Sequence, residues 1–309
     1  PLQGNSYIMP PINSAEDPVE HDIQEIPQVL QSIETSWRDP ASFNRQSADY
    51  LAELLIAKAK SWDRRQRATI DIKLDRVATD RSVDLLITGV ESSLWLGERF
   101  AQDLITIFPA LKVATISANQ VLRKLPSDSN RLHLGQNSII LAISQSGQTF
   151  PTLQATHAFE ELRRQGSIGA LFVMTGEICS LMGTAIEQYY YPASSFTRRI
   201  FINGSGRRTA EPTTIAVAAA QATLTELLLY LAKRLRQSFP GQHGAFEMTL
   251  TAAHLETLDR VKAEFIDLSV VPIVGKTASG ETSNSAVHRQ LRRSGRNWAL
   301  HVTETPLVW

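Results

Sequence analysis

The chain has 309 residues, of which 43% are hydrophobic and 20% are charged, a composition typical of a globular protein with a sizeable core. Lysine and arginine together number 31, as do aspartate and glutamate, so the overall charge gives no reason to expect binding to nucleic acid or to an acidic membrane. The single cysteine, Cys179, excludes an internal disulfide framework and a cysteine-rich metal site, and it fits a reducing cytoplasm.

The N-terminal region is predicted to hold an arm and two helices. Residues 1–20 are rich in Pro, Asn and Ser and lack the basic and apolar regions of a signal peptide. Apolar residues recur at helical spacing over 21–37, and again from Ser47, the expected N-cap, to about Trp62. The charged stretch from there to Arg81 alternates acidic with basic residues, which favours a solvated helix or linker over a nucleic-acid surface.

From residue 82 onward, short apolar runs alternate with helical patterns. This succession predicts an α/β fold in which a mainly parallel five-stranded sheet lies between two layers of helices, with ligands at the carboxyl ends of the strands. The predicted strands are 83–90, 113–117, 138–143, 170–175 and 187–191. A long apolar helix is expected to run to about Arg236, and polar residues within it, such as Gln221 and Glu226, favour a buried helix over a membrane span.

The main candidate site follows the third of these strands. The six residues Ser144–Thr149 (SQSGQT) have no apolar side chain, and Pro151 with the apolar spacing as far as Leu162 predicts a helix directly after them. The loop therefore combines backbone N–H groups, the positive end of a helix dipole and three hydroxyls, which together favour a bound phosphate. The alternative is an ordinary polar turn with a serine helix cap.

Each residue type in this loop has a chemical reason to bind a sugar phosphate. The hydroxyls of Ser144, Ser146 and Thr149 can donate hydrogen bonds to phosphate oxygens, and the amides of Gln145 and Gln148 can both donate to and accept from sugar hydroxyls. Gly147 allows a close backbone approach or a positive φ.

Two further polar segments lie where the fold would place a ligand. The turn after the first strand carries Ser92 and Ser93, and its expected position lets it converge with the loop 144–149. Residues 202–214 are rich in glycine and hydroxyls before a helix; there Arg207 and Arg208 either add positive charge or are solvated, and we favour the latter. Neither G-x-G-x-x-G nor a Walker loop occurs, which argues against the commonest nucleotide sites.

The segment Ile143–Thr149 resembles the S-Q-S-G-E-T signature of sugar isomerase (SIS) domains. The surrounding chain is most similar to the isomerase half of glucosamine-fructose-6-phosphate aminotransferase. Residues 21–34 resemble that family's E-I-x-E-Q-P helix, 88–96 its C-G-T-S turn and 211–233 its V-A-S-T-K helix, so the resemblance covers roughly 21–236.

The resemblance implies a flavodoxin-like three-layer SIS fold. We expect an extended arm over 1–20, a helical region over 21–81, a first SIS domain over 82–236, and over 237–309 a linking helix and the start of a second SIS unit. Its ligand would be a hexose or hexosamine phosphate, held by Ser144, Gln145, Ser146, Gly147, Gln148 and Thr149, with Ser92, Ser93 and Thr214 near the sugar. It also implies a homodimer.

The chain departs from the family pattern at positions that matter for catalysis. Gln148 replaces a glutamate, Val90-Glu91 replace a small Thr-Ser pair, and the lysine of S-T-K has no counterpart. A carboxylate at Glu91 would repel a phosphate unless it points away or pairs with an arginine. In the segment after 237, Glu281 and His288 are the nearby candidates for general acid and base, although loop residues of this kind are more often plain surface.

Two functions from different classes remain open. The first is a phosphosugar-binding protein that does not catalyse, and the second is an aldose-ketose isomerase; an SIS-type transcription regulator ranks last, because no basic recognition helix is predicted. An amidotransferase on this chain is excluded, since Cys179 is not an N-terminal nucleophile. We expect no cofactor and no metal ion, as no H-x-x-x-H or H-E-x-x-H pair occurs.

Overall fold

The computed structural model describes most of the chain between its two ends. The described residues are 18–71, 82–125, 129–187, 199–206, 208, 214–241 and 244–269. Two compact units are present, Pro1–Leu250 and Thr251–Trp309. The first contains the sheet, and in the second the structure describes one helix, α8 (Ala252–Ser269).

The sheet has five strands, all parallel, in the order β2-β1-β3-β4-β5. This is the flavodoxin-like order of a doubly wound α/β fold, in which the chain reverses its direction of winding between β1 and β3. The predicted α/β fold with a five-stranded parallel sheet is confirmed. The strands are β1 (Leu85–Gly89), β2 (Val113–Ser117), β3 (Ile139–Ile143), β4 (Ala170–Thr175) and β5 (Ile200–Ile202).

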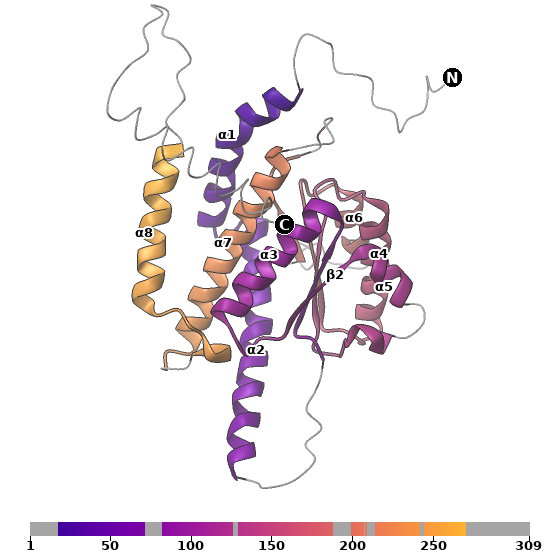
Figure 1. Cartoon of the computed structure of the whole chain (residues 1–309), viewed down its shortest axis with the longest axis vertical. Helices are drawn as coiled ribbons and strands as arrows, with labels where there is room; N and C mark the ends of the chain where they lie inside the picture. Colours follow the sequence, from indigo (N-terminus) through magenta and orange to yellow (C-terminus); the bar gives the residue numbers. More distant parts are fainter. Residues whose placement is uncertain are drawn as a thin grey trace, which may run out of the picture. The chain divides into compact units, whose positions relative to one another are not determined.

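Helices cover both faces of the sheet, as parallel strands with buried faces require (Figure 1). On one face lie α4 (Ala118–Lys124), α5 (Phe150–Arg164) and α6 (Leu181–Glu187), and on the other lie α2 (Phe43–Asp71), α3 (Glu91–Ile107) and α7 (Thr214–Ser238), with α1 (Pro18–Arg38) packed against α7. The described part of the first unit also contains the short 3-10 helices η1 (Ser129–Leu132) and η3 (Ala245–Glu247).

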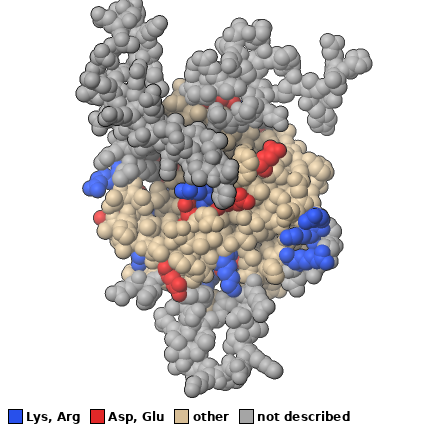
Figure 2. Space-filling model, viewed as in Figure 1, with Lys and Arg blue, Asp and Glu red and all other residues tan. Residues whose placement is uncertain are grey.

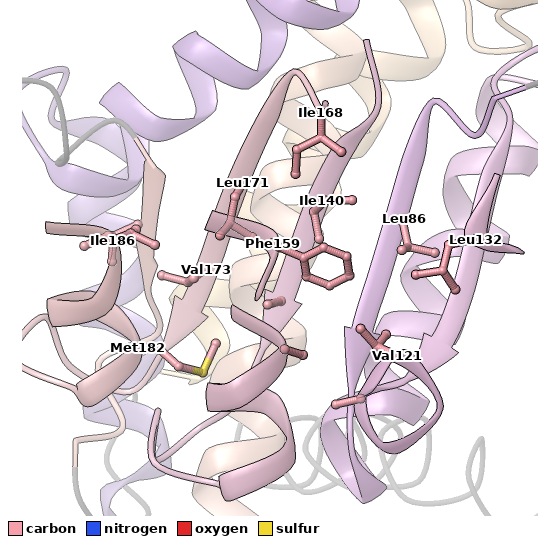
Figure 3. Packing of buried hydrophobic residues seen from close by; sticks show 14 residues of the cluster. Leu86, Val121, Leu132, Ile140, Phe159, Ile168, Leu171, Val173, Met182 and Ile186 are labelled. Atoms are coloured by element: carbon pink, nitrogen blue, oxygen red, sulfur yellow. The ribbon is translucent and has the colours of Figure 1, made fainter. Parts of the chain in front are cut away.

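The core beneath α4, α5 and α6 is formed by aliphatic side chains around one aromatic ring. Figure 3 shows Phe159 of α5 over the strands that carry Ile140 and Leu171, with Leu86 of β1 and Val121 of α4 on the neighbouring side. All five side chains are at most 2% exposed. Burial of such residues supplies the main favourable free energy of folding, at about 1.5–3 kcal/mol per large aliphatic or aromatic side chain.

Aromatic rings dominate the opposite face. Trp37 of α1 stacks on Phe201 of β5 with ring centroids 6.5 Å apart, and Phe201 stacks in turn on Phe172 of β4 at 5.9 Å. Tyr230 of α7 packs against Trp37 at 6.1 Å and donates a hydrogen bond to Asp49. Burial and this hydrogen bond raise the pKa of the Tyr230 phenol.

The helix α7 is long and apolar enough to cross a membrane over Ile215–Ser238. In the described structure it packs against α1, α2 and α3, and 56% of its most apolar 18-residue stretch is buried. Such burial is typical of the core helix of a globular protein, so the length and apolar composition of α7 are weak evidence for a membrane span.

The outer edge of β5 is covered by two polar side chains of α2. The Asn44 amide donates to Ile202 O at 2.9 Å and accepts from Ile202 N at 2.7 Å, and the Ser47 hydroxyl donates to Ile200 O at 2.7 Å and accepts from Ile200 N at 3.1 Å. These four bonds take the place of a sixth strand and protect an otherwise open sheet edge. Ser47 therefore lies inside α2, and the prediction that it caps the helix is wrong, because the helix begins at Phe43.

Replacing Asn44 with alanine is expected to destabilise the protein by about 2 kcal/mol, because two partly buried backbone groups of Ile202 lose their partners. Glu53→Ala, at an exposed position of the same helix, is the control and should change the stability by less than about 0.5 kcal/mol. Urea unfolding followed by circular dichroism measures both. Equal stabilities of the two variants would show that the amide contributes nothing at this edge.

One carboxylate is buried with two arginines. Glu160 of α5 is 0% exposed and accepts from Arg163 Nε at 2.9 Å and from Arg199 Nη1 at 2.8 Å, and the guanidinium of Arg199 also donates to Ile186 O at 3.0 Å. Arg199 precedes β5 directly, so the cluster connects the start of that strand to α5 and α6.

On the surface, the charged side chains on the face in Figure 2 form small groups of either sign among uncharged residues.

Other sequence predictions differ from the structure in detail. The fifth strand is Ile200–Ile202 and not 187–191, because Glu187 is the last residue of α6; residues 188–191 lie outside the described residues. The helix predicted over 21–37, which could have been interrupted or begun near Pro27, is a continuous α1 that contains this proline. The linking helix expected within 237–309, for which the apolar pattern indicated 245–265, begins at Ala252 and is preceded by η3. The N-terminal arm and everything after residue 269 lie outside the described residues.

Candidate functional site

The β3–α5 loop, residues 144–149, lies at the point where the order of the sheet reverses. Strand β1 pairs with β2 on one side and with β3 on the other, so the loops that follow β1 and β3 leave the sheet in opposite directions. In doubly wound α/β folds the crevice outside the carboxyl ends of the strands at this point is the usual ligand site.

Three hydroxyls of the β3–α5 loop converge. Ser144 Oγ lies 3.2 Å from Thr149 Oγ1, and Ser146 Oγ lies 3.4 Å from the same atom. Backbone N–H groups hold two of them in place, since Gly147 N donates to Ser144 Oγ and Gln148 N donates to Ser146 Oγ, both at 3.2 Å. The three hydroxyls thus form a compact set, in which Ser144 is 2% exposed and donates its hydroxyl to Thr149.

The first turn of α5 adds backbone donors to this set. Thr149 is the N-cap residue, and among the described residues its side chain makes no capping bond to the helix. The helix has 15 residues, so its dipole places partial positive charge at this end. An anion at the loop would therefore meet both hydroxyls and unsatisfied helix N–H groups.

Gly147 is required because the end of β4 and the loop after it, residues 175–180, lie close to it. Its φ is +60°, and a Cβ at this position would lie 2.4 Å from Ser180 Cβ and 3.1 Å from Thr175 Cγ2. Gly147 O also accepts from Met182 N at 3.0 Å. The close approach fixes the position of the β3–α5 loop relative to the start of α6. This role of the loop after β4 was not predicted from the sequence.

Gln145 connects the β3–α5 loop to the loop that follows β5. Its amide Nε2 donates to Gly206 O at 2.6 Å, and its backbone O accepts from Gly176 N at 2.7 Å. Gly206 N donates in turn to Gly176 O at 3.1 Å. Gln145, whose amide the sequence assigned to sugar hydroxyls, therefore joins the β3–α5 loop to the loop after β5 through its amide nitrogen and to the loop after β4 through its backbone oxygen.

Arg208 is not a solvated loop residue. Its guanidinium donates to Asp22 Oδ1 at 3.0 Å and to Glu25 Oε2 at 2.5 Å, both in α1, and to Ser205 O at 2.5 Å. The side chain is only 15% exposed. Its positive charge is shared with two carboxylates, so it adds little net positive charge for an anion.

The other predicted site residues are found in different places. Ser93, half-buried, and Ser92, exposed, lie in the first turn of α3 after β1. Thr214 is the first residue of α7. Glu281 and His288 lie outside the described residues, so their predicted role as acid and base stays a prediction.

The fold is similar to that of a solved aminotransferase domain. The C-terminal domain of glucosamine-fructose-6-phosphate aminotransferase from Francisella tularensis superposes with a TM-score of 0.53 over 82% of this chain, at 14% sequence identity. The chain has the sugar isomerase (SIS) fold. It spans 55% of the length of the aminotransferase domain, about half, and the identity is low enough that the likeness concerns the fold alone.

Other SIS-fold structures are similar at a lower score. The NanR protein of Vibrio vulnificus, solved in complex with ManNAc-6P, covers 82% of this chain and 70% of its own, with 17% identity and a TM-score of 0.43. No protein-family model matches the sequence, and no curated protein does so either.

Two buried hydroxyls near the carboxyl edge of the SIS sheet were not singled out from the sequence. Thr88, paired in register with Ala142 near the end of β1, and Thr152, in the first turn of α5, are each 0% exposed. Within the described chain neither Oγ1 has a hydrogen-bond partner. Buried hydroxyls without partners are costly, so both are groups that an ordered water or a bound ligand would satisfy.

No group of three or more His, Cys, Asp or Glu side chains suitable for a metal ion occurs among the described residues. The side chains that converge at the β3–α5 loop are hydroxyls and amides. These groups suit an anionic, hydroxylated ligand better than a metal ion.

Proposed function

We propose that this chain binds a sugar phosphate and holds its phosphate group in the β3–α5 loop. The observation that carries the proposal is the convergence of Ser144, Ser146 and Thr149 at the amino end of α5, at the point of strand-order reversal. Hydroxyls and helix N–H groups donate hydrogen bonds to phosphate oxygens, and the helix dipole favours the negative charge. Gln148, exposed beside these hydroxyls, is the amide best placed to reach a sugar hydroxyl.

The proposal extends to domain organisation and assembly. We place a first SIS domain over 82–236, after the N-terminal helices, and a second SIS unit that begins within 237–309. A homodimer in the cytoplasm is our proposal for its state in the cell. Support for a protein contact near the site comes from two large apolar side chains, Phe150 at 68% and Leu181 at 49% exposed, which are the first residues of α5 and α6.

Binding without catalysis is the form of the proposal that the residues favour. The family's lysine has no counterpart in this sequence, and Glu91 occupies a position where the family has a small residue. NMR of the chain mixed with glucose 6-phosphate or fructose 6-phosphate distinguishes a binding protein from an isomerase. We expect no interconversion of the two sugars. Interconversion would show that the chain is an isomerase.

Calorimetric titration with fructose 6-phosphate, glucose 6-phosphate and glucosamine 6-phosphate tests the site. We expect Ser146→Ala to weaken binding about tenfold or more, because a hydrogen bond to a charged group is lost. Ser167→Ala is the matched control, since this exposed serine lies in the loop before β4, at the opposite edge of the sheet, and binding should not change. Equal affinities of the two variants would place the phosphate elsewhere.

A further inference from the structure

Glu91 adopts a backbone conformation that residues other than glycine rarely adopt. It is the first residue of α3 and has a φ of +48°, in the left-handed region where glycine and, less often, asparagine or aspartate are found. Strained residues of this kind cluster at active sites and ligand-binding loops, where the surrounding structure holds them in place. The observation makes Glu91 a candidate for a functional role.

The turn that carries Glu91 lies directly against the end of β3. A Cβ on Gly89 would lie 2.9 Å from Ile143 O, so the last residue of β1 approaches the residue that precedes the β3–α5 loop. Glu91 follows two residues later, and its side chain is exposed, whereas α3 turns other residues, such as Gly97 and Phe100, toward the core. Glu91 is therefore exposed at the carboxyl edge of the sheet, two residues after the point where β1 approaches the end of β3.

In the described parts of the loops at this edge, a phosphate meets no basic side chain other than Arg208. The β3–α5 loop is neutral, and the guanidinium of Arg208 is engaged by Asp22 and Glu25. Along the described parts of the loops after the five strands, residues 89–93, 117–120, 144–149, 175–180, 203–206 and 208, Arg208 is the one lysine or arginine. Glu91 adds a further negative charge, which opposes the binding of a purely anionic ligand.

We propose that Glu91 selects phosphorylated sugars that also carry an ammonium group. The inference rests on the proposed function: the β3–α5 loop holds the phosphate, and the carboxylate of Glu91 forms a charge-assisted hydrogen bond to the ammonium. The ligand then supplies the positive charge that the described loops lack. A sugar with a hydroxyl or an acetylated amine at that position leaves the carboxylate unpaired and binds more weakly.

Affinities of three ligands for the full chain test this selectivity. Glucosamine 6-phosphate, N-acetylglucosamine 6-phosphate and glucose 6-phosphate are titrated at about pH 6.5, where an amine with a pKa near that of an α-amino group is largely protonated. We expect the wild-type chain to prefer the ammonium form about fivefold, as for an exposed ion pair. Glu91→Gln should abolish the preference, and Glu98→Gln, exposed on the same helix, should retain it.

Glu91→Gly provides a second variant that keeps the backbone intact, because a positive φ suits glycine. It should also lose the preference while binding glucose 6-phosphate at least as tightly as the wild-type chain does. Equal wild-type affinities for the three ligands, or a preference that persists in both Glu91 variants, would overturn the selectivity but leave the phosphate site standing. Failure of all three ligands to bind would overturn the proposed function itself.

Discussion

Glu160→Ala is expected to destabilise the protein by about 3–5 kcal/mol, the usual cost when one partner of a buried ion pair is removed. The carboxylate is 0% exposed and Arg199 is 3% exposed, so the guanidinium would stay buried without its counter-charge. The cluster also fixes the start of β5 against α5. Urea unfolding of the variant beside the wild-type chain measures the loss.

The adjacent residue supplies the control for this effect. Glu161 also pairs with an arginine one turn away, Arg164 at 3.1 Å, but the two side chains are 54% and 46% exposed. Glu161→Ala should therefore cost at most about 1 kcal/mol. A double variant, Glu160→Leu with Arg199→Met, should lose less than Glu160→Ala because no buried charge of Arg199 is left alone. Similar losses for Glu160→Ala and Glu161→Ala would contradict the account.

Gly147→Ala is expected to disrupt the β3–α5 loop and to cost about 2–5 kcal/mol. A left-handed φ costs a residue with a side chain about 1–2 kcal/mol, and the new methyl group would lie 2.4 Å from Ser180 Cβ, an overpacking worth about 1–3 kcal/mol. The loop must move, so affinity for a sugar phosphate should fall more than tenfold. Thermal unfolding and calorimetric titration measure the two effects.

Gly166→Ala separates the backbone cost from the steric cost. Gly166 has a φ of +71°, and a Cβ there would meet nothing within 4 Å. This variant should be destabilised by about 1–2 kcal/mol, with sugar-phosphate affinity unchanged, because the residue lies in the loop between α5 and β4, away from the carboxyl ends of the strands. If Gly147→Ala behaved in the same way, the contact with Ser180 would have no importance for the site.

Much of the fold could be predicted because its strands are short, continuous apolar runs. The predicted bounds of β2 and β4 agree with the structure, and the alternation of strands and helices was sufficient for the sheet class. Strand β5 was misplaced because it has only three residues and no periodicity can be read from so short a run. It forms where the side chains of α2, more than 150 residues away in sequence, satisfy its outer edge.

The candidate site was predictable where its chemistry is local. The hydroxyls of the β3–α5 loop are adjacent in sequence, so their convergence followed from a strand, a turn and a helix. The engagement of Arg208 by Asp22 and Glu25 joins residues separated by 186 and 183 positions, and pairings at this separation leave no local pattern. Gln145 likewise has a partner 61 positions away in Gly206, which its suitability for sugar hydroxyls did not indicate.

A crystal structure of the full chain with glucose 6-phosphate is the most direct test of the central claim. We expect phosphate oxygens within hydrogen-bond distance of Ser144, Ser146 or Thr149 and of the first N–H groups of α5, at the edge where β1 and β3 end. A phosphosugar bound at another edge of the sheet, or no phosphosugar at a concentration that saturates the chain in solution, would contradict it.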